Sequence, residues 1–222
     1  MSSEHYSPWC TSQRHTPDAW PPVAQRQDIL AEAITIIREL HTADLITRQG
    51  DCSRIDSTLI WDLPDQAVPN VAAVPGEKSI ARFAPPGDHL ITTEPRAELL
   101  ASWAKVHDGP SRSTGQIPIC QGAGKDAAIA MAHDQFRWFS GGWAVDTDLP
   151  TPAGFEAVSQ FVRPEDVAES IPCGPDPDEL ADAVREYAAA GITDVAPAQV
   201  GAAHQQRFLD EAAGPLLEKL PG

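Results

Sequence analysis

Residues 171–195, IPCGPDPDELADAVREYAAAGITDV, decide the fold of this chain. Asp176 can cap a helix, Pro177 suits the first turn of that helix, and Gly191 suits the position after its end. The predicted helix has one buried face, formed by Leu180, Val184, Tyr187 and Ala188. The β-prone segment ITDVAPAQV follows at once, so the stretch predicts a helix that leads into a strand.

The same alternation of short apolar strands and helices occupies the chain before this stretch. Strands are predicted at 70–74, 88–95, 115–122 and 192–200. Helices are predicted at 77–84, 96–107, 125–139, 154–161, 164–170 and 203–220, the last interrupted near Gly214-Pro215. Short apolar strands that are joined by helices indicate a parallel α/β sheet. Pro118 and Pro197 are unfavourable inside their strands, because proline cannot donate to a ladder.

The N-terminal part differs from this pattern. Residues 1–19 are polar and aperiodic, which predicts an irregular arm before a single domain at 20–222. A helix is predicted at 23–41, and a β-hairpin at 45–64 turns at Gln49-Gly50-Asp51. Residues 140–154 are predicted to form a loop.

Composition excludes several classes of protein. The 222 residues include 32 acidic and 16 basic side chains, and a formal charge of −16 repels nucleic acid and anionic membranes. No stretch approaches the roughly 20 apolar residues of a membrane span, and no apolar signal-peptide core is present. We therefore expect a cytoplasmic protein. The four cysteines share no close spacing, which argues against a zinc site.

Cys173 suggests a reactive thiol, and the segment CQGAGKDAA at 120–128 suggests a phosphate loop, but each also has a purely structural interpretation. A thiolate is favoured before a helix, yet no histidine is near Cys173, and a small residue in a loop is the better interpretation. A phosphate loop needs glycine where Ile119 stands and Ser or Thr where Asp126 stands, so a plain turn is favoured.

Two further groups of residues remain as candidates. His133, Phe136, Trp138, Phe139 and Trp143 could line a site for a flat ring, although aromatics at helical spacing usually form a core. Gly76 opens a helix after one strand, and Thr92, Thr93 and Arg96 follow the next strand. Ligands of parallel α/β proteins gather at the carboxyl ends of the strands, which favours an anion site there. The alternatives are a plain strand-end turn at Gly76 and an Arg96 that is only solvated.

Three segments carry a resemblance to a known family. They are WPPVAQRQDILAEAITIIREL at 20–40, AHDQFRWFSGGW at 132–143 and the long stretch 149–195. They resemble the later part of the luciferase-like flavin and deazaflavin enzymes. The most similar branch is the F420-dependent oxidoreductases similar to F420-dependent glucose-6-phosphate dehydrogenase. The resemblance implies a partial (β/α)8 TIM barrel, with barrel strands five to eight near 70, 89, 117 and 194 and the hairpin as an insertion.

The resemblance also implies a site and a reaction. Gly76 matches the glycine that holds the phosphate of coenzyme F420, and Thr93 and Arg96 match positions at the substrate end. No metal and no catalytic residue is carried over, because strands one to four and their catalytic residues have no counterpart here. The implied function is hydride transfer between a deazaflavin and a small-molecule substrate, by a chain that is truncated and inactive alone. Cys173 is structural on this view.

A half-barrel leaves apolar side chains and strand edges uncovered. The inward face is expected to show Val71, Ala73, Leu90, Ile117 and Ile119 to water. A homodimer or another partner would then cover the open barrel face. The alternatives that remain are a non-catalytic half-barrel binding or assembly subunit, an enzyme completed by a second chain, and a thiol enzyme at Cys173.

Overall fold

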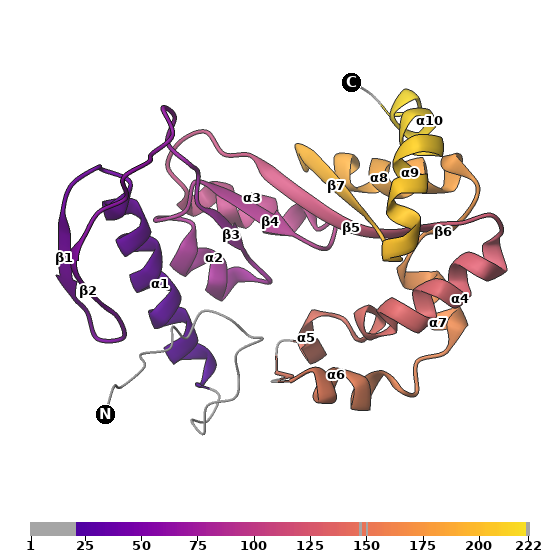
Figure 1. Ribbon diagram of the computed structural model, residues 1–222, viewed down its shortest axis with the longest axis horizontal. Coiled ribbons are helices and arrows are strands. Elements are labelled where there is room, and N and C mark those ends of the chain that lie inside the picture. Colours follow the sequence, from indigo (N-terminus) through magenta and orange to yellow (C-terminus); the bar gives the residue numbers. More distant parts are fainter. Residues whose placement is uncertain (1–20, 147, 150, 221–222) are drawn as a thin grey trace. The chain divides into compact units, whose positions relative to one another are not determined.

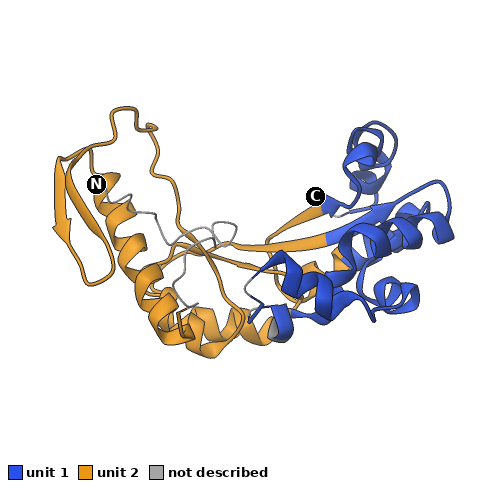
Figure 2. Ribbon diagram, turned by 60° about the horizontal axis from the view of Figure 1, so that its bottom comes forward, with its two compact units in different colours: residues 1–20, 118–183, 198–222 blue, residues 21–117, 184–197 orange. Residues whose placement is uncertain are grey.

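The computed structural model describes residues 21–220 except 147 and 150 (Figure 1). These residues form two compact units (Figure 2). The first, here called the β3–β4 unit, holds residues 21–117 and 184–197. The second, here called the α4–α7 unit, holds residues 118–183 and 198–220 of the described part. The predicted arm at 1–19 lies outside the described residues.

The elements follow the predicted order (Figure 1). The β3–β4 unit contains α1 (Val23–Leu40), β1 (Ile46–Gln49), β2 (Arg54–Thr58), β3 (Val71–Ala73), α2 (Glu77–Phe83), β4 (His89–Thr92) and α3 (Ala97–Val106). The α4–α7 unit contains α4 (Lys125–Phe136), α5 (Trp143–Asp146), α6 (Pro152–Ser159), α7 (Pro164–Ser170), β6 (Cys173–Gly174), α9 (Gln205–Glu211) and α10 (Ala213–Glu218). Both units include residues of β5 (Ser113–Gln121), α8 (Pro177–Ala189) and β7 (Asp194–Gln199).

The strands of the main sheet pair in parallel. Val71 is opposite His89 where β3 meets β4, and Leu90 is opposite Ser113 where β4 meets β5. β6 and β7 also pair with β5. Parallel strands joined by helices confirm the predicted α/β class, and the succession β3, β4, β5, β7 is that of a partial (β/α)8 barrel.

The burial of three strand residues, two in the β3–β4 unit and one in the α4–α7 unit, corrects the predicted direction of their side chains. Leu90, Ile117 and Ile119, expected on the open face, are all buried. Leu90 packs in a cluster with residues of α1, α2, α3 and β3, namely Ile34, Ala72, Val74, Ile80, Phe83, Ala84, Leu99 and Trp103. Because side chains alternate between the two faces of a strand, the neighbours of Ala72 lie on the other face. Val71 and Ala73 are indeed exposed, as predicted.

The α4–α7 unit has a core of its own. It is formed by Cys120, Ala128, Ala132, Val167, Ile171, Cys173 and Val200. The interpretation of Cys173 as a loop residue is wrong, because Cys173 and Gly174 form a short strand that pairs with β5. Sequence propensity does not reveal a two-residue strand, because such a segment is a strand only through its pairing with a neighbouring strand. A buried, ladder-paired Cys173 agrees with a structural role.

The hairpin is joined to α1 by a carboxylate. Glu32 accepts hydrogen bonds from the backbone N–H groups of Cys52 and Ser53, at 2.9 and 3.1 Å. A Cβ atom on Gly50 would lie 1.5 Å from the same carboxylate, so the glycine leaves room for Glu32 to reach the turn. β1 and β2 are antiparallel, which confirms the predicted hairpin.

Several boundaries differ from the predictions. The predicted loop at 140–154 contains α5 and the start of α6, because Thr151 caps α6 and Pro152 occupies its first turn. The closing helix breaks at Ala212 rather than at Gly214-Pro215. β7 begins at Asp194, two residues after the predicted start.

Pro118 is accommodated inside β5 by its place between two ladders. The pairing with β4 ends at Gly115, and the pairing with β6 begins at Cys120. Pro118 therefore occupies an interval in which neither ladder needs an N–H donor, so the usual cost of proline in a strand does not arise.

Candidate functional site

The ends of β3 and β4 lie at one edge of the β3–β4 unit. β3 ends at Ala73 and leads through Pro75 and Gly76 into α2, while β4 ends at Thr92 and leads through Thr93 into the turn before α3. Because the two strands are parallel and paired, both turns leave the sheet at its carboxyl edge. The three residues that sequence analysis assigned to a ligand, Gly76, Thr93 and Arg96, belong to these two turns.

Gly76 presents open backbone at this edge. A Cβ atom built on Gly76 meets no other heavy atom within 4 Å. Its φ angle of 179° is extended backbone that any residue can adopt, so local conformation does not require glycine here. Open space above a glycine after a strand is what close approach of a ligand to the backbone needs.

Arg96 connects the second turn to the first. Its Nη1 donates to the carbonyl oxygen of Pro75 at 3.5 Å, directly before Gly76. Its guanidinium also contacts two carboxylates, with Nε 2.8 Å from Glu98 and Nη1 3.6 Å from Glu94. The hydrogen bond with Glu98, assisted by Glu94, raises the pKa of Arg96 above its ordinary value. The positive charge is thus already compensated by neighbouring acids.

Tyr187 supports the same edge from α8, a role that sequence analysis did not predict. Its hydroxyl donates to the carbonyl oxygen of Thr93 at 2.7 Å and lies 3.5 Å from that of Gln116. The ring occupies the space beside Gly115, where an added Cβ would lie 2.2 Å from the tyrosine Cδ1. Burial, with Glu94 and Glu186 nearby, raises the pKa of Tyr187 to about 12. Sequence analysis identified Tyr187 only as part of a buried helix face.

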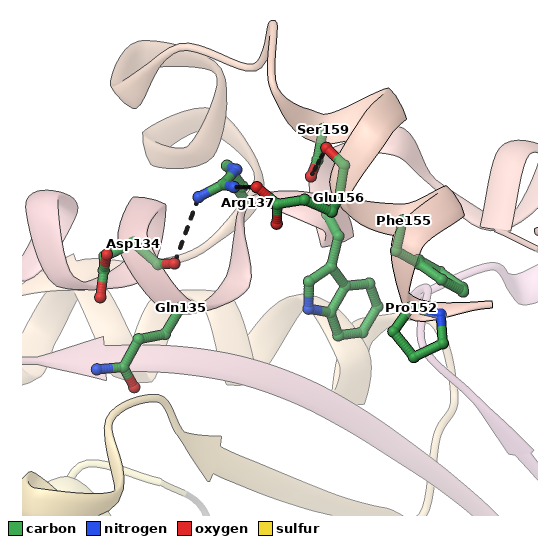
Figure 3. Close-up of a pocket in the computed structure, with 8 residues that line it drawn as sticks. Asp134, Gln135, Arg137, Pro152, Phe155, Glu156 and Ser159 are labelled. Carbon is green, nitrogen blue, oxygen red and sulfur yellow. Dashed lines mark hydrogen bonds and ion pairs between the residues drawn. The ribbon is translucent and has the colours of Figure 1, made fainter. Parts of the chain in front are cut away.

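A separate hollow of about 400 Å³ lies in the α4–α7 unit (Figure 3). Its lining residues come from α4, the turn after it and α6, namely Asp134, Gln135, Arg137, Trp138, Pro152, Phe155, Glu156 and Ser159. Trp138 and Phe155 meet edge to face with ring centres 5.8 Å apart. Arg137 bridges the hollow's two helical segments through an ion pair with Glu156 at 2.5 Å.

Of the aromatic residues predicted to line a site for a flat ring, the hollow includes only Trp138 among those whose side chains are described. Trp138 lines the hollow, whereas Phe136 and Phe139 pack against Trp138 and against each other. His133 is held by a hydrogen bond between its Nε2 and the carbonyl oxygen of Val162 at 2.8 Å. The aromatic residues in the described part of this segment therefore serve mainly as packing, which is the simpler alternative for aromatics at helical spacing. The side chain of Trp143 lies outside the described residues.

The described part of the chain shows neither a metal-binding cluster nor a membrane span. Among residues 21–220 without 147 and 150, no group of three or more His, Cys, Asp or Glu side chains is arranged to hold a metal ion. Within the same residues, no helix is long and apolar enough to cross a membrane.

Solved structures define the class of protein to which this fold is similar. An F420-dependent secondary alcohol dehydrogenase in complex with an F420-acetone adduct superposes with a TM-score of 0.74 at 19% identity, over 92% of this chain and 64% of that one. EDTA monooxygenase from Chelativorans sp. BNC1 superposes with a TM-score of 0.61 at 12% identity, over 90% and 61% of the two chains. The fold is that of a partial luciferase-like barrel.

Sequence comparison is more specific. No protein-family model matches the chain. The chain is 28% identical over 216 residues to the F420-dependent glucose-6-phosphate dehydrogenase of Intrasporangium calvum, over 91% of this chain and 64% of the relative. It is also 28% identical over 185 residues to the F420-dependent hydroxymycolic acid dehydrogenase of Mycobacterium tuberculosis, over 78% of this chain and 49% of the relative.

These findings confirm the resemblance predicted from sequence. The chain resembles luciferase-like F420-dependent oxidoreductases, and F420-dependent glucose-6-phosphate dehydrogenases are among the relatives that it matches. It spans less than two thirds of the length of these relatives, which fits the C-terminal part of such an enzyme.

Proposed function

We propose that residues 20–222 form one luciferase-like half-barrel domain that binds coenzyme F420 and takes part in hydride transfer to or from a small organic substrate. Gly76 approaches the phosphate of the deazaflavin cofactor, and Thr93 and Arg96 contact the substrate. The contact of Arg96 with the Pro75 carbonyl carries this proposal, because it brings the predicted cofactor turn and the predicted substrate turn together. The similarity to F420-dependent relatives supports the choice of cofactor.

The charges around Arg96 favour a neutral, hydroxyl-bearing substrate. Glu94 and Glu98 already engage the guanidinium, so an anionic substrate would have to displace them and would meet their negative charge. Carboxylates accept hydrogen bonds from hydroxyl groups, and the guanidinium can donate to an alcohol or carbonyl oxygen. The relatives and the structural neighbour are named for hydroxyl-bearing substrates, namely glucose 6-phosphate, hydroxymycolic acid and a secondary alcohol. These names support the hydroxyl group and not the neutral charge, because glucose 6-phosphate carries an anionic phosphate. In the oxidative direction, the alcohol carbon would give a hydride to the deazaflavin, and the hydroxyl proton would pass to water.

Titration with F420 tests the proposal. F420 fluorescence should change on addition of protein, and Gly76→Leu should weaken binding by about tenfold or more, since the side chain fills the open approach to the backbone. Gly124→Leu is a matched control, because Gly124 also opens a helix after a strand and also has no atom within 4 Å of an added Cβ. Unchanged F420 fluorescence at saturating protein, or equal effects of the two variants, would contradict the proposal.

A second function is favoured by the open face of the sheet. Val71 is 46% exposed and Ala73 is exposed on the face opposite the core, and β3 pairs only with β4 among the described strands. A non-catalytic half-barrel binding or assembly subunit, covered by a second copy or another chain, would bury this face. Sedimentation combined with an activity assay separates the two functions. A monomer that turns over substrate with F420 and without a partner chain is not an assembly subunit. A dimer without F420 binding would favour the subunit.

A further inference from the structure

Two cysteines that are distant in sequence lie side by side in the core of the α4–α7 unit. Cys120 is on β5 and Cys173 is on β6, and the two residues are opposite each other in the parallel ladder. The backbone N–H of Cys120 donates to the carbonyl oxygen of Pro172 at 2.9 Å, which fixes this register. Both side chains are buried, and they belong to the same core cluster.

This arrangement meets the covalent requirements of a disulfide. Neighbouring strands lie about 4.8 Å apart, and disulfides join Cα atoms that are about 4.4–6.8 Å apart. Register partners direct their side chains to the same face of a sheet, so the two sulfur atoms point into the same space. The neighbouring core residues, Ala128, Ala132, Val167 and Ile171, hold both strands in place from one side.

The two thiols are not equivalent. The hydrogen bond from the Cys173 thiol holds the pKa of Cys120 below its ordinary value, while the same contact and burial raise the pKa of Cys173. Cys120 also donates its own thiol proton to the carbonyl oxygen of Ala128, at 3.2 Å between Sγ and O. Cys120 is therefore the thiol that ionises first, and Cys173 is the thiol that follows.

We propose that Cys120 and Cys173 form a reversible, peroxide-sensitive disulfide across β5 and β6. Hydrogen peroxide is the oxidant named here, because it is close to water in size, and Cys120 and Cys173 are too deeply buried, at 0% and 4% exposed, for exchange with larger disulfides. The Cys120 sulfur attacks one peroxide oxygen, the O–O bond breaks, and the first water leaves with the thiol proton. The Cys173 sulfur then attacks the sulfenic sulfur, the S–O bond breaks, and the second water leaves with the Cys173 proton. Two thiols are oxidised and one peroxide is reduced to two waters.

The bond would constrain the segment that carries α4 to α7. That segment begins after Cys120 and ends before Cys173, so the disulfide closes it into a loop and reduces the freedom of the unfolded chain. Oxidation should therefore raise the thermal midpoint by several degrees, and dithiothreitol should reverse the increase.

The experiment uses the full chain with Cys10→Ser and Cys52→Ser, which keeps only the two cysteines of interest. After hydrogen peroxide treatment of the folded protein, we expect a mass that is lower by two hydrogen atoms and the loss of both thiols. Tryptic digestion should link the peptide 113–125 to the peptide 138–185, and dithiothreitol should restore both thiols. The same treatment of the four-cysteine chain should link the same two peptides.

Variants of Cys173 test the second step. Cys173→Ala should leave Cys120 to react onward to sulfinic acid, with no rise in thermal midpoint, and Cys173→Ser serves if the alanine variant does not fold. Sulfinic acid at Cys120 beside a free Cys173 in the two-cysteine protein would overturn the proposal. So would a disulfide between chains, or thiols that survive peroxide in the folded protein.

Discussion

The hydroxyl of Tyr187 donates a hydrogen bond to the carbonyl oxygen of Thr93, across 94 positions of sequence. The bond joins α8 to the turn after β4, which carries the proposed substrate contacts. A helix near the end of the chain therefore positions a turn in its first half.

Removing this hydroxyl should destabilise the protein without changing its packing. Tyr187→Phe leaves the ring in place but takes the donor from a part-buried carbonyl, so we expect the free energy of unfolding to fall by about 1–2 kcal/mol. Urea denaturation measures the change. Ser170→Ala removes an exposed hydroxyl that donates to the Asp166 carbonyl, and it should cost less than about 0.5 kcal/mol. Equal losses of free energy of unfolding in the two variants would show that the hydrogen bond to Thr93 stabilises the protein no more than an exposed hydrogen bond does.

Tyr187 should also make the protein sensitive to alkali. Burial raises its pKa from 10.0 to about 12 in the folded protein, whereas the unfolded chain has the ordinary value. The unfolded state therefore loses the proton first, so the stabilising contribution is complete below pH 10 and is lost as the pH rises towards about 12. Denaturation across this pH range should show a steeper loss of stability in wild type than in Tyr187→Phe.

Phenolate absorbance provides an independent readout of the same shift. The chain has two tyrosines, and Tyr187→Phe leaves only Tyr6 to titrate. The difference between the two absorbance curves should have its midpoint near pH 12. A midpoint near 10 would show that Tyr187 is not buried in solution.

Gly115 should tolerate no side chain because of the same tyrosine. A Cβ there would lie 2.2 Å from Cδ1 of Tyr187 and 3.3 Å from Cγ2 of Ile192. We expect Gly115→Ala to lower the free energy of unfolding by about 1–3 kcal/mol, since overpacking a core displaces its neighbours. Gly124→Ala has open space around the new methyl group and should cost less than about 1 kcal/mol. The pair is compared by urea denaturation.

The partner of Gly115 can be tested by a double variant. The clash is reduced when Gly115→Ala is combined with Tyr187→Leu. The loss in free energy of unfolding of the double variant should therefore be smaller than the sum of the losses of the two single variants. Strict additivity would indicate that the new methyl group meets another part of the structure.

Asp166 should keep its charge in moderately acid solution. Arg163 contacts Asp166 through its guanidinium and its backbone N–H, and these bonds lower the pKa of Asp166 from 3.8 to about 2. A lowered pKa stabilises the folded state above the unfolded value, and this contribution is lost as the pH falls from about 4 to about 2. Carboxyl NMR titration should show a midpoint near 2 in wild type and a value closer to 3.8 in Arg163→Gln. Glu165→Gln should leave the Asp166 midpoint nearly unchanged.

Local sequence signals were sufficient where the structure depends on neighbouring residues. Asp176 accepts a hydrogen bond from the Asp178 N–H at the start of α8, and Gly191 has the positive φ of 93° expected after its end. The strand–helix alternation likewise predicted the parallel sheet. These features were predictable because caps and periodicity act within a few residues.

Features set by distant residues were not predictable in the same way. His89–Thr92 contains two adjacent apolar residues, Leu90 and Ile91, so alternation alone cannot decide which of them faces the core, and the prediction that Leu90 faces the open side is wrong. The contact of Arg96 with Pro75 and the support of Thr93 by Tyr187 depend on how two turns and a later helix meet. β6 exists only because β5 is beside it.

The place of Pro118 has a consequence for how β5 opens. Proline has no exchangeable amide proton, and the β4 ladder before it and the β6 ladder after it share no donor, while β7 pairs with β5 as well. The amide of Leu90 reports on the first ladder through Arg112, and the amide of Cys120 reports on the second through Pro172. Separate time courses of deuterium uptake at these two amides would show that the β4 and β6 ladders of the nine-residue strand open one at a time, whereas equal time courses would show that the pairing with β7 holds the strand together.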